Sequence, residues 1–281
     1  MTDPTSGVRR CAVLGSPIVH SLSPVLHRAA YADLGLPWSY DAVEVAEAGL
    51  EAFVAGLDPS WRGLSLTMPL KRAVLPLLDE IDPEASRAGA ANTLLLEDDG
   101  RRVGHNTDVP GAAAAIRERY AGPVTRAAVL GGGATAASTL LALADLGCET
   151  ATLLVRDPAR AGETLEAVAR YGTPTVDVGL LAETDRVGRV DVLVSTIPAG
   201  AQTAAHEQLA ARSGVVFDVV YDPWPTPLAR AAETADVALV SGLDLLVHQA
   251  VLQVGLMTGQ PGPLAVMRAA GEAALEDRAR G

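Results

Sequence analysis

A glycine-rich turn between two apolar segments constrains the fold of this chain more than any other feature. Residues 127–130 form a short apolar run, three glycines follow at 131–133, and an Ala/Leu-rich segment covers 134–146. This order predicts a buried strand, a tight turn and a helix. Such a turn presents backbone N–H groups at the positive end of the helix, where a phosphate group can bind.

The spacing inside the turn indicates a dinucleotide. Gly131, Gly133 and Ala136 match the G-x-G-x-x-G/A pattern. The next apolar run, 150–155, follows at the interval expected of a βαβ unit. We therefore favour nucleotide binding over a purely structural glycine turn.

Composition narrows the class of protein. Hydrophobic residues make up 49% of the 281 residues, so a substantial core can be buried, and the net charge of −12 argues against nucleic acid and anionic membranes as partners.

Cys11 and Cys148 are interpreted as buried thiols, and the cysteines and histidines form no pattern that indicates a metal site. We expect a cytoplasmic protein, because the sequence has no signal core and no apolar stretch of membrane length.

Strand-like and helix-like segments alternate along the chain, which predicts an α/β fold with largely parallel sheets. A second block begins near Asp108. Two helices are expected at the end of the chain, over 243–257 and 263–280, and they either cap the second block or cross back to the first. In the first block we expect a helix over 24–34, with Ser23 at its N-cap.

Three short motifs precede the glycine turn. In the first, Ser21 and Ser23 lie two residues apart before Pro24, which favours an extended backbone, so both hydroxyls can bind a carboxylate or a diol. The alternative is that Ser23 only caps a helix.

The second motif ends an apolar strand with Ser65 and Thr67 and leads to Lys71, and the third contains Asn92 and, further on, Asp108. A lysine whose protonation is tuned by an aspartate can act as a general acid or base. A solvated lysine and a helix-capping aspartate are the structural alternatives.

These motifs together resemble the shikimate dehydrogenase family over nearly the whole chain. The similarity rests on ordered segments: Gly15–Pro24, Thr67–Lys71, Ala90–Thr93, Asn106–Asp108, Gly131–Ala134 and Gly242–Gln249. The resemblance implies a substrate-binding α/β domain at 1–107 and 243–281, with the final helices returning to it. It implies a Rossmann-like NADP-binding domain at 108–242.

The resemblance also implies an activity, the reversible NADPH-dependent reduction of 3-dehydroshikimate to shikimate, on the pathway to chorismate and the aromatic amino acids. Lys71 would donate the proton to the forming alkoxide, and Asp108 would fix the position of Lys71. The implied substrate contacts are Ser21, Ser23, Ser65, Thr67, Lys71, Asn92, Asp108, Tyr221 and Gln249. The implied cofactor contacts are Gly131, Gly132, Gly133, Ala134, Arg156, Arg160, Thr196, Val219, Gly242 and Leu245. The partners expected are small molecules, with the chain a monomer or homodimer.

Two departures from the family pattern bear on specificity. Ser65 stands where the family usually has asparagine, so one ring-hydroxyl contact is expected to be weaker or bridged by water. In the cofactor-selecting loop, Arg156 and Arg160 suit a 2′-phosphate, whereas Asp157 would repel one unless it only caps the next helix. We favour NADP and leave NAD open.

Two kinds of alternative function remain open. The first is a sibling enzyme, a quinate or aminoshikimate dehydrogenase using NAD(P). The second is an NADP-binding regulator without catalysis, which would be expected to have lost Lys71 or Asp108.

Overall fold

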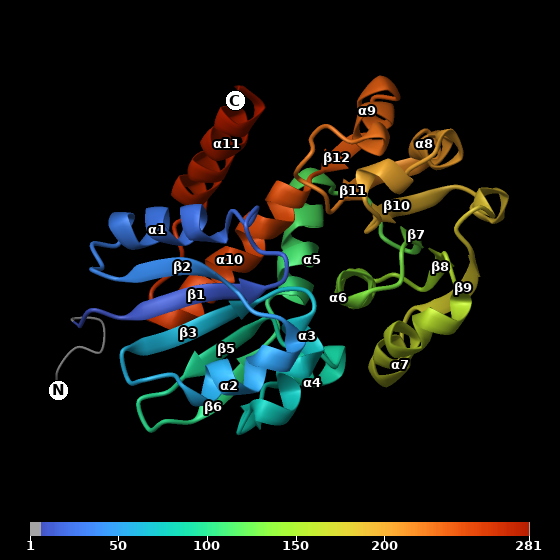
Figure 1. Cartoon of the computed structure of the whole chain (residues 1–281). Coiled ribbons are helices and arrows are strands. Elements are labelled where there is room, and N and C mark those ends of the chain that lie inside the picture. Colours follow the sequence, from blue (N-terminus) through green and yellow to red (C-terminus); the bar gives the residue numbers. More distant parts are fainter. Residues whose placement is uncertain (1–6, 281) are drawn as a thin grey trace. The chain divides into compact units, whose positions relative to one another are not determined.

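The computed structural model describes residues 7–280, apart from the side chain of Arg160. These residues divide into two compact units. The first unit combines the chain up to Thr107 with the chain from Leu246 onward, and the second is Asp108–Leu245. Figure 1 shows the elements of both.

The first unit is built on a mixed sheet, which has six strands within the described residues. In spatial order these are β2 (Ser39–Glu44), β1 (Arg10–Gly15), β3 (Trp61–Leu66), β5 (Thr93–Leu96), β6 (Arg102–His105) and β4 (Glu80–Ile81). Strand β1 is parallel to both β2 and β3, whereas β5 is antiparallel to β3 and to β6. The carboxyl ends of β1, β3 and β6 and the amino end of β5 therefore lie at the same edge of the sheet.

Helices cover both faces of this sheet. They are α1 (Ser23–Asp33), α2 (Leu50–Ala55), α3 (Leu70–Ala73), α4 (Pro83–Ala88), α10 (Gly242–Thr258) and α11 (Leu264–Arg280), with 3-10 turns at Glu47–Gly49 and Leu75–Leu77. Because side chains alternate along a strand, Leu64 and Leu66 of β3 join a core with α2, α3 and α4. Gly63 and Ser65 face the opposite way, toward α10.

The second unit has a wholly parallel sheet of six strands in the described part of the chain. Their spatial order is β12 (Ala238–Val240), β11 (Ser213–Asp218), β10 (Val190–Ser195), β7 (Arg126–Leu130), β8 (Thr150–Val155) and β9 (Thr175–Leu180). Counted within the unit and read from the other edge, this is 3-2-1-4-5-6, the doubly wound order of dinucleotide-binding folds. Strand order reverses between β7 and β10.

The helices of this unit are α5 (Asp108–Arg119), α6 (Ala134–Asp145), α7 (Gly162–Tyr171), α8 (Ala204–Ala210) and α9 (Pro227–Thr234), with 3-10 turns at Pro158–Ala161, Thr184–Arg186 and Ala199–Ala201. Residues of α8 and α9 pack with β7, β10 and β11 in one apolar cluster. On β7 every residue after Arg126 is buried, as expected of a strand covered on both faces.

The sequence-based fold class is confirmed, with corrections in detail. Helix α11 packs against α1, so the final helices return to the first unit as predicted. Ser23 is not an N-cap: it begins α1, and Leu22 occupies the cap position without a side-chain hydrogen bond. The pattern also missed β4, β9, α2, α8 and α9. Strand β4 has two residues, β9 is half exposed and lacks a continuous apolar run, and each of the three helices has eight residues or fewer.

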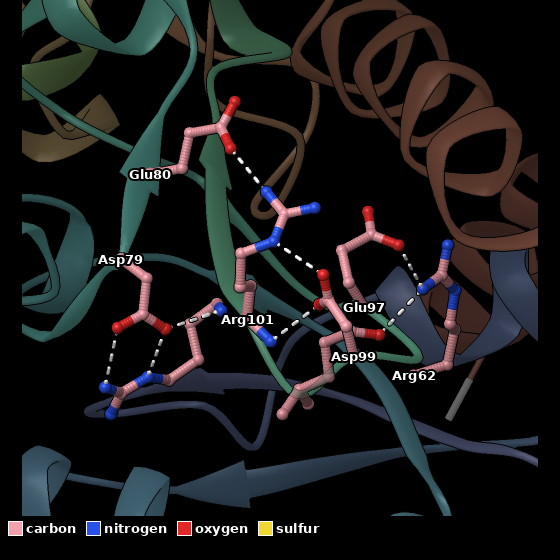
Figure 2. A network of polar contacts seen from close by, with 8 residues as sticks. Arg62, Asp79, Glu80, Glu97, Asp99 and Arg101 are labelled. Carbon is pink, nitrogen blue, oxygen red and sulfur yellow. Dashed lines mark hydrogen bonds and ion pairs between the residues drawn. The ribbon is translucent and has the colours of Figure 1, made fainter.

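Ion pairs, most of them exposed, join the β5–β6 hairpin to β3 and β4 (Figure 2). Arg101 contacts both Glu80 and Asp99, at 2.6 and 2.7 Å, and Arg62 contacts Glu97 at 3.2 Å. Hydrogen bonding from Arg101 lowers the pKa of Asp99. Because water screens the exposed pairs of Arg101, these pairs add little to stability.

Candidate functional site

The glycine turn of the second unit is formed as the spacing predicts. Strand β7 ends at Leu130, and Gly131 has a φ of +106°, a conformation that favours glycine. A side chain at Gly131 would also overlap the hydroxyl of Thr196. Helix α6 then begins at Ala134 with Gly133 at its cap position and no capping side chain, so the N–H groups of its first turn have no side-chain partner there.

The turn lies where α/β folds bind ligands. It follows β7, and Thr196 follows β10, the strand on the other side of the order reversal. The backbone N–H of Thr196 donates to the Leu130 carbonyl at 2.8 Å, which joins the two loops. Val219 follows β11 and Gly242 follows β12, so the glycine turn and three further predicted cofactor contacts lie at the carboxyl edge of one sheet.

A buried threonine braces this turn and was missed by motif analysis. The hydroxyl of Thr164, on α7, is fully buried and donates to the carbonyls of Gly132 and Gly133, at 2.9 and 3.3 Å. Holding the carbonyls from behind orients the peptide N–H groups to the other side. Only the burial of a polar residue on a helix signals this role, and burial cannot be read from a motif.

The loop after β8 contains the arginines expected to select the cofactor. Arg156 is exposed, and the side chain of Arg160 lies outside the described part of the structure. Asp157 caps the following 3-10 turn, accepting a hydrogen bond from the Ala159 N–H at 3.0 Å. The capping alternative for Asp157 is therefore confirmed. Leu245, the last predicted cofactor contact, lies half-buried in the first turn of α10.

In the first unit, the serine motif and the Thr67 motif meet at the carboxyl edge of the sheet. The N–H of Thr67 donates to Leu14 at 2.9 Å, and the N–H of Ser16 donates to Met68 at 3.0 Å. A methyl group on Gly15 would collide with Thr67, so the two loops pack in direct contact. The Ser23 N–H donates to the Ser21 hydroxyl at 3.3 Å, which brings the serine pair together.

Lys71 and Asn92 lie next to each other at the same edge. The carbonyl of Lys71, on α3, accepts the N–H of Ala91 at 2.8 Å. The Asn92 side chain is buried and donates to the Thr107 hydroxyl at 2.8 Å and to Gln249 Oε1, on α10, at 3.4 Å. Four predicted substrate contacts, Thr67, Lys71, Asn92 and Gln249, thus belong to one edge of this unit.

Two predicted site residues belong to the second unit. Asp108, which is buried, is the first residue of α5 and directly follows Thr107 in the chain. Tyr221 is half-buried in the segment after β11.

A count of basic residues gives a further signal. Of the 22 lysines and arginines in the sequence, one is lysine, and it is Lys71. An arginine stays protonated in proteins, whereas a lysine can give up and regain a proton. Lys71 is therefore the one basic side chain among these 22 that can readily exchange a proton.

No cluster of three or more His, Cys, Asp or Glu residues that could hold a metal ion occurs among the described residues. The same residues include no helix that is long and apolar enough to span a membrane.

Fold and site together define the class: a two-unit α/β protein in which one unit is Rossmann-like and the other gathers polar side chains at one sheet edge. Comparison with known proteins gives the family. Residues 13–94 match the Shikimate dehydrogenase substrate binding domain, and residues 242–270 match the Shikimate 5'-dehydrogenase C-terminal domain. The chain belongs to the shikimate dehydrogenase family.

Individual relatives cover nearly the full length. A shikimate dehydrogenase (NADP(+)) of Moorella thermoacetica is 37% identical over 91% of this chain and 90% of its own length. The crystal structure of a shikimate 5-dehydrogenase from Mycobacterium fortuitum is 42% identical with a TM-score of 0.84, covering 94% of this chain and 98% of that one. A Thermus thermophilus shikimate 5-dehydrogenase, solved with NADP(H) and shikimate, is 33% identical with a TM-score of 0.83, covering 95% and 99%.

Proposed function

We propose that this chain is an NADP-dependent shikimate dehydrogenase, which interconverts 3-dehydroshikimate and shikimate. The observation that carries the proposal is the place of its one lysine. Lys71 lies at the sheet edge beside Asn92, within the Thr67–Lys71 motif that this family shares.

Lys71 supplies the acid in this reaction. Reduction of the ketone leaves negative charge on oxygen, and the Lys71 ammonium stabilises that charge and donates the proton that completes the alcohol. In the reverse direction the neutral amine accepts the proton from the shikimate hydroxyl. Asp108, the buried first residue of α5, is proposed as the carboxylate that orients the Lys71 ammonium.

The remaining substrate contacts divide by chemistry. Ser21 and Ser23 donate hydroxyl hydrogen bonds to the substrate carboxylate. Side chains with both donors and acceptors bind the ring hydroxyls, and these are Thr67, Asn92, Tyr221 and Gln249. Because the net charge of the protein is −12, the anionic substrate is held by local hydrogen bonds and by Lys71 and not by the overall field.

The second unit fits the cofactor. A methyl group added to Gly133 would meet no atom within 4 Å, whereas one on Gly132 would lie 2.8 Å from Val155, so the turn is open on one side and packed on the other. A pyrophosphate fits the open side, against the N–H groups of residues 132–134, because the N–H of Gly131 donates to the Leu154 carbonyl at 2.8 Å. The nicotinamide end would be contacted by Thr196, Val219, Gly242 and Leu245.

The 2′-phosphate would be held by Arg156 and Arg160, while the Asp157 carboxylate caps the following 3-10 turn. When bound, NADP(H) supplies the hydride exchange.

Steady-state kinetics test the proposal directly. Shikimate, quinate and aminoshikimate are each assayed with NADP and with NAD. We expect the highest kcat/KM for shikimate with NADP. A preference for quinate or aminoshikimate would reassign the substrate, and a lack of turnover with any pair would refute the enzyme in favour of an NADP-binding regulator.

Two substitutions separate charge from proton transfer. Lys71→Ala removes both, and we expect kcat to fall about 10³-fold with a modest change in KM. Lys71→Arg keeps the charge but cannot release a proton, so we expect a loss of similar size. Arg87→Ala, on the exposed surface of α4, is the control. Turnover retained by Lys71→Arg would remove Lys71 as the acid.

We also expect a cytoplasmic monomer or homodimer that acts on free metabolites. Both cysteines are unpaired and buried, which suits a reducing compartment. Size-exclusion chromatography with light scattering measures the oligomeric state, and cell fractionation measures the location.

A further inference from the structure

The hydroxyl of Ser65 is already committed within the first unit. Ser65 is buried, and its Oγ accepts a hydrogen bond from the Tyr40 hydroxyl at 2.6 Å. The same Oγ donates to Gln253 Oε1, on α10, at 2.8 Å. A serine hydroxyl has one proton, so Ser65 has none left to donate to a ligand.

The hydrogen bonds continue in one direction from Gln253. Its amide Nε2 donates to the Thr93 hydroxyl at 2.9 Å and to the carbonyl of Asn92 at 3.2 Å. The Thr93 hydroxyl in turn donates to Asn92 Oδ1 at 3.0 Å. Gln253 and Thr93 are as buried as Ser65, so each bond is sheltered from competition by water.

This chain of bonds ends on the side chain of Asn92 and fixes which way its amide faces. Asn92 Oδ1 accepts from Thr93 and from the backbone N–H of Thr107, the latter at 2.8 Å. Rotating the amide by half a turn would set its NH₂ against the backbone N–H of Thr107, which cannot accept, and would take away the acceptor of the Thr93 hydroxyl. The Asn92 Nδ2 is thereby aimed at Thr107 and at Gln249, and the longer contact, 3.4 Å to Gln249, is the one that a ring hydroxyl would replace.

We propose that Ser65 is a positioning residue: its hydroxyl holds Gln253, and Gln253 fixes, through Thr93, the amide of Asn92 that binds a ring hydroxyl. This inference rests on the proposed function, since it takes Asn92 as a substrate contact. It replaces the expectation that Ser65 is a shortened substrate contact. Tyr40 supports the arrangement because its proton occupies one lone pair of Ser65 and leaves the Ser65 proton for Gln253.

A double-mutant cycle on shikimate kinetics distinguishes positioning from direct contact. The variants are Ser65→Ala, Gln253→Met and the pair. We expect each single substitution to raise KM for shikimate about 5- to 20-fold, with kcat and the KM for NADP within about 2-fold of the parent. The double variant should be no worse than the more affected single variant, because both changes interrupt the same chain of bonds.

A control variant and a replacement variant complete the experiment. Thr258→Val removes another buried hydroxyl on α10, one that donates to the Val254 carbonyl, and should leave KM unchanged. If Ser65→Ala does not fold, Tyr40→Phe replaces it in the cycle, judged by the same criterion with an expected single effect of about 2- to 5-fold.

The outcomes of these experiments distinguish a positioning role of Ser65 from the other roles it could have. Multiplying effects in the double variant, or an unchanged KM in Gln253→Met, would overturn the positioning role and make Ser65 an independent contact or a bystander. A fall in kcat with both KM values unchanged would also overturn it, since that pattern reports only lost folded protein. Absence of shikimate turnover in the parent would instead overturn the proposed function, and this inference with it.

Discussion

The two units prepare their sites by opposite means. The first unit relies on side chains: Ser65, Gln253, Thr93 and Asn92 bond to one another in a buried chain at the sheet edge. The second relies on backbone: three glycines form the turn after β7, and Thr164 is the side chain that braces it. A site built from side chains depends on the identity of residues far apart in sequence, whereas a backbone site depends on the absence of side chains at a few adjacent positions.

This contrast has an energetic side. Each member of the buried chain has its polar partners inside the protein, so removing one leaves the next without a partner at a cost of about 1–3 kcal/mol. In the glycine turn, an added side-chain atom destabilises the structure because it forces backbone strain or steric overlap. The site of the first unit is therefore expected to be sensitive to the removal of side-chain atoms, and that of the second unit to the addition of side-chain atoms.

The largest effect expected concerns His27, which belongs to the side-chain-built unit. It is fully buried, stacks on Tyr40 at 3.9 Å and makes one hydrogen bond, to the Ser23 carbonyl. Burial lowers its pKa to about 4, from 6.5. Between pH 6.5 and 4 the unfolded chain thus binds a proton that the folded chain does not. The free energy of unfolding therefore decreases as the pH is lowered through this window, by about 3 kcal/mol at pH 4.

Urea denaturation at several pH values between 7 and 4 measures that dependence. His27→Gln should lose this part of it, because glutamine does not titrate. The carboxylates that also titrate in the window are common to both proteins and cancel in the difference. Equal slopes in the two proteins would show that His27 takes up its proton as readily in the folded protein as in the unfolded chain.

The second effect tests addition in the backbone-built site. Gly131→Ala places a methyl group at φ +106°, against Thr196. Strain of about 1–3 kcal/mol corresponds to roughly a 5- to 150-fold increase in KM for NADP. Calorimetric titration with shikimate should show unchanged affinity. A proportional loss of both affinities would mean that the turn does not act on the cofactor alone.

The third effect tests deletion in that same site. Thr164→Val keeps the shape but removes the hydroxyl that holds Gly132 and Gly133. We expect KM for NADP to rise about 2- to 10-fold. Thr139→Val, a buried hydroxyl on α6 that bonds only to its own helix, serves as the matched comparison. Equal behaviour of the two variants would show that the brace is unimportant.

The smallest effect is expected at the exposed ion pairs of Figure 2. Arg101→Ala removes contacts to Glu80 and Asp99, yet all three side chains are more than half exposed. We expect kinetics and melting temperature to stay within experimental error of the parent. A clear drop in melting temperature would show that a surface network matters as much as the buried one.

The same contrast explains what the sequence could predict. The glycine turn and the helix after it follow from local pattern, and so does the parallel arrangement of the strands. The serine, lysine and asparagine motifs are also local. Tyr40, Thr164 and Gln253 matter through partners between 25 and 188 residues away, so no local pattern contains them. Ser23 was misplaced for a related reason: its neighbour Pro24 signals a helix start but not its exact residue.

The single lysine turns the chain into its own reporter. Lysine labelled with ¹⁵N at its side-chain nitrogen would give one such resonance in the whole NMR spectrum, from Lys71. Following that resonance while shikimate is added and the pH is changed would record the protonation of one atom, without substitution and without a crystal.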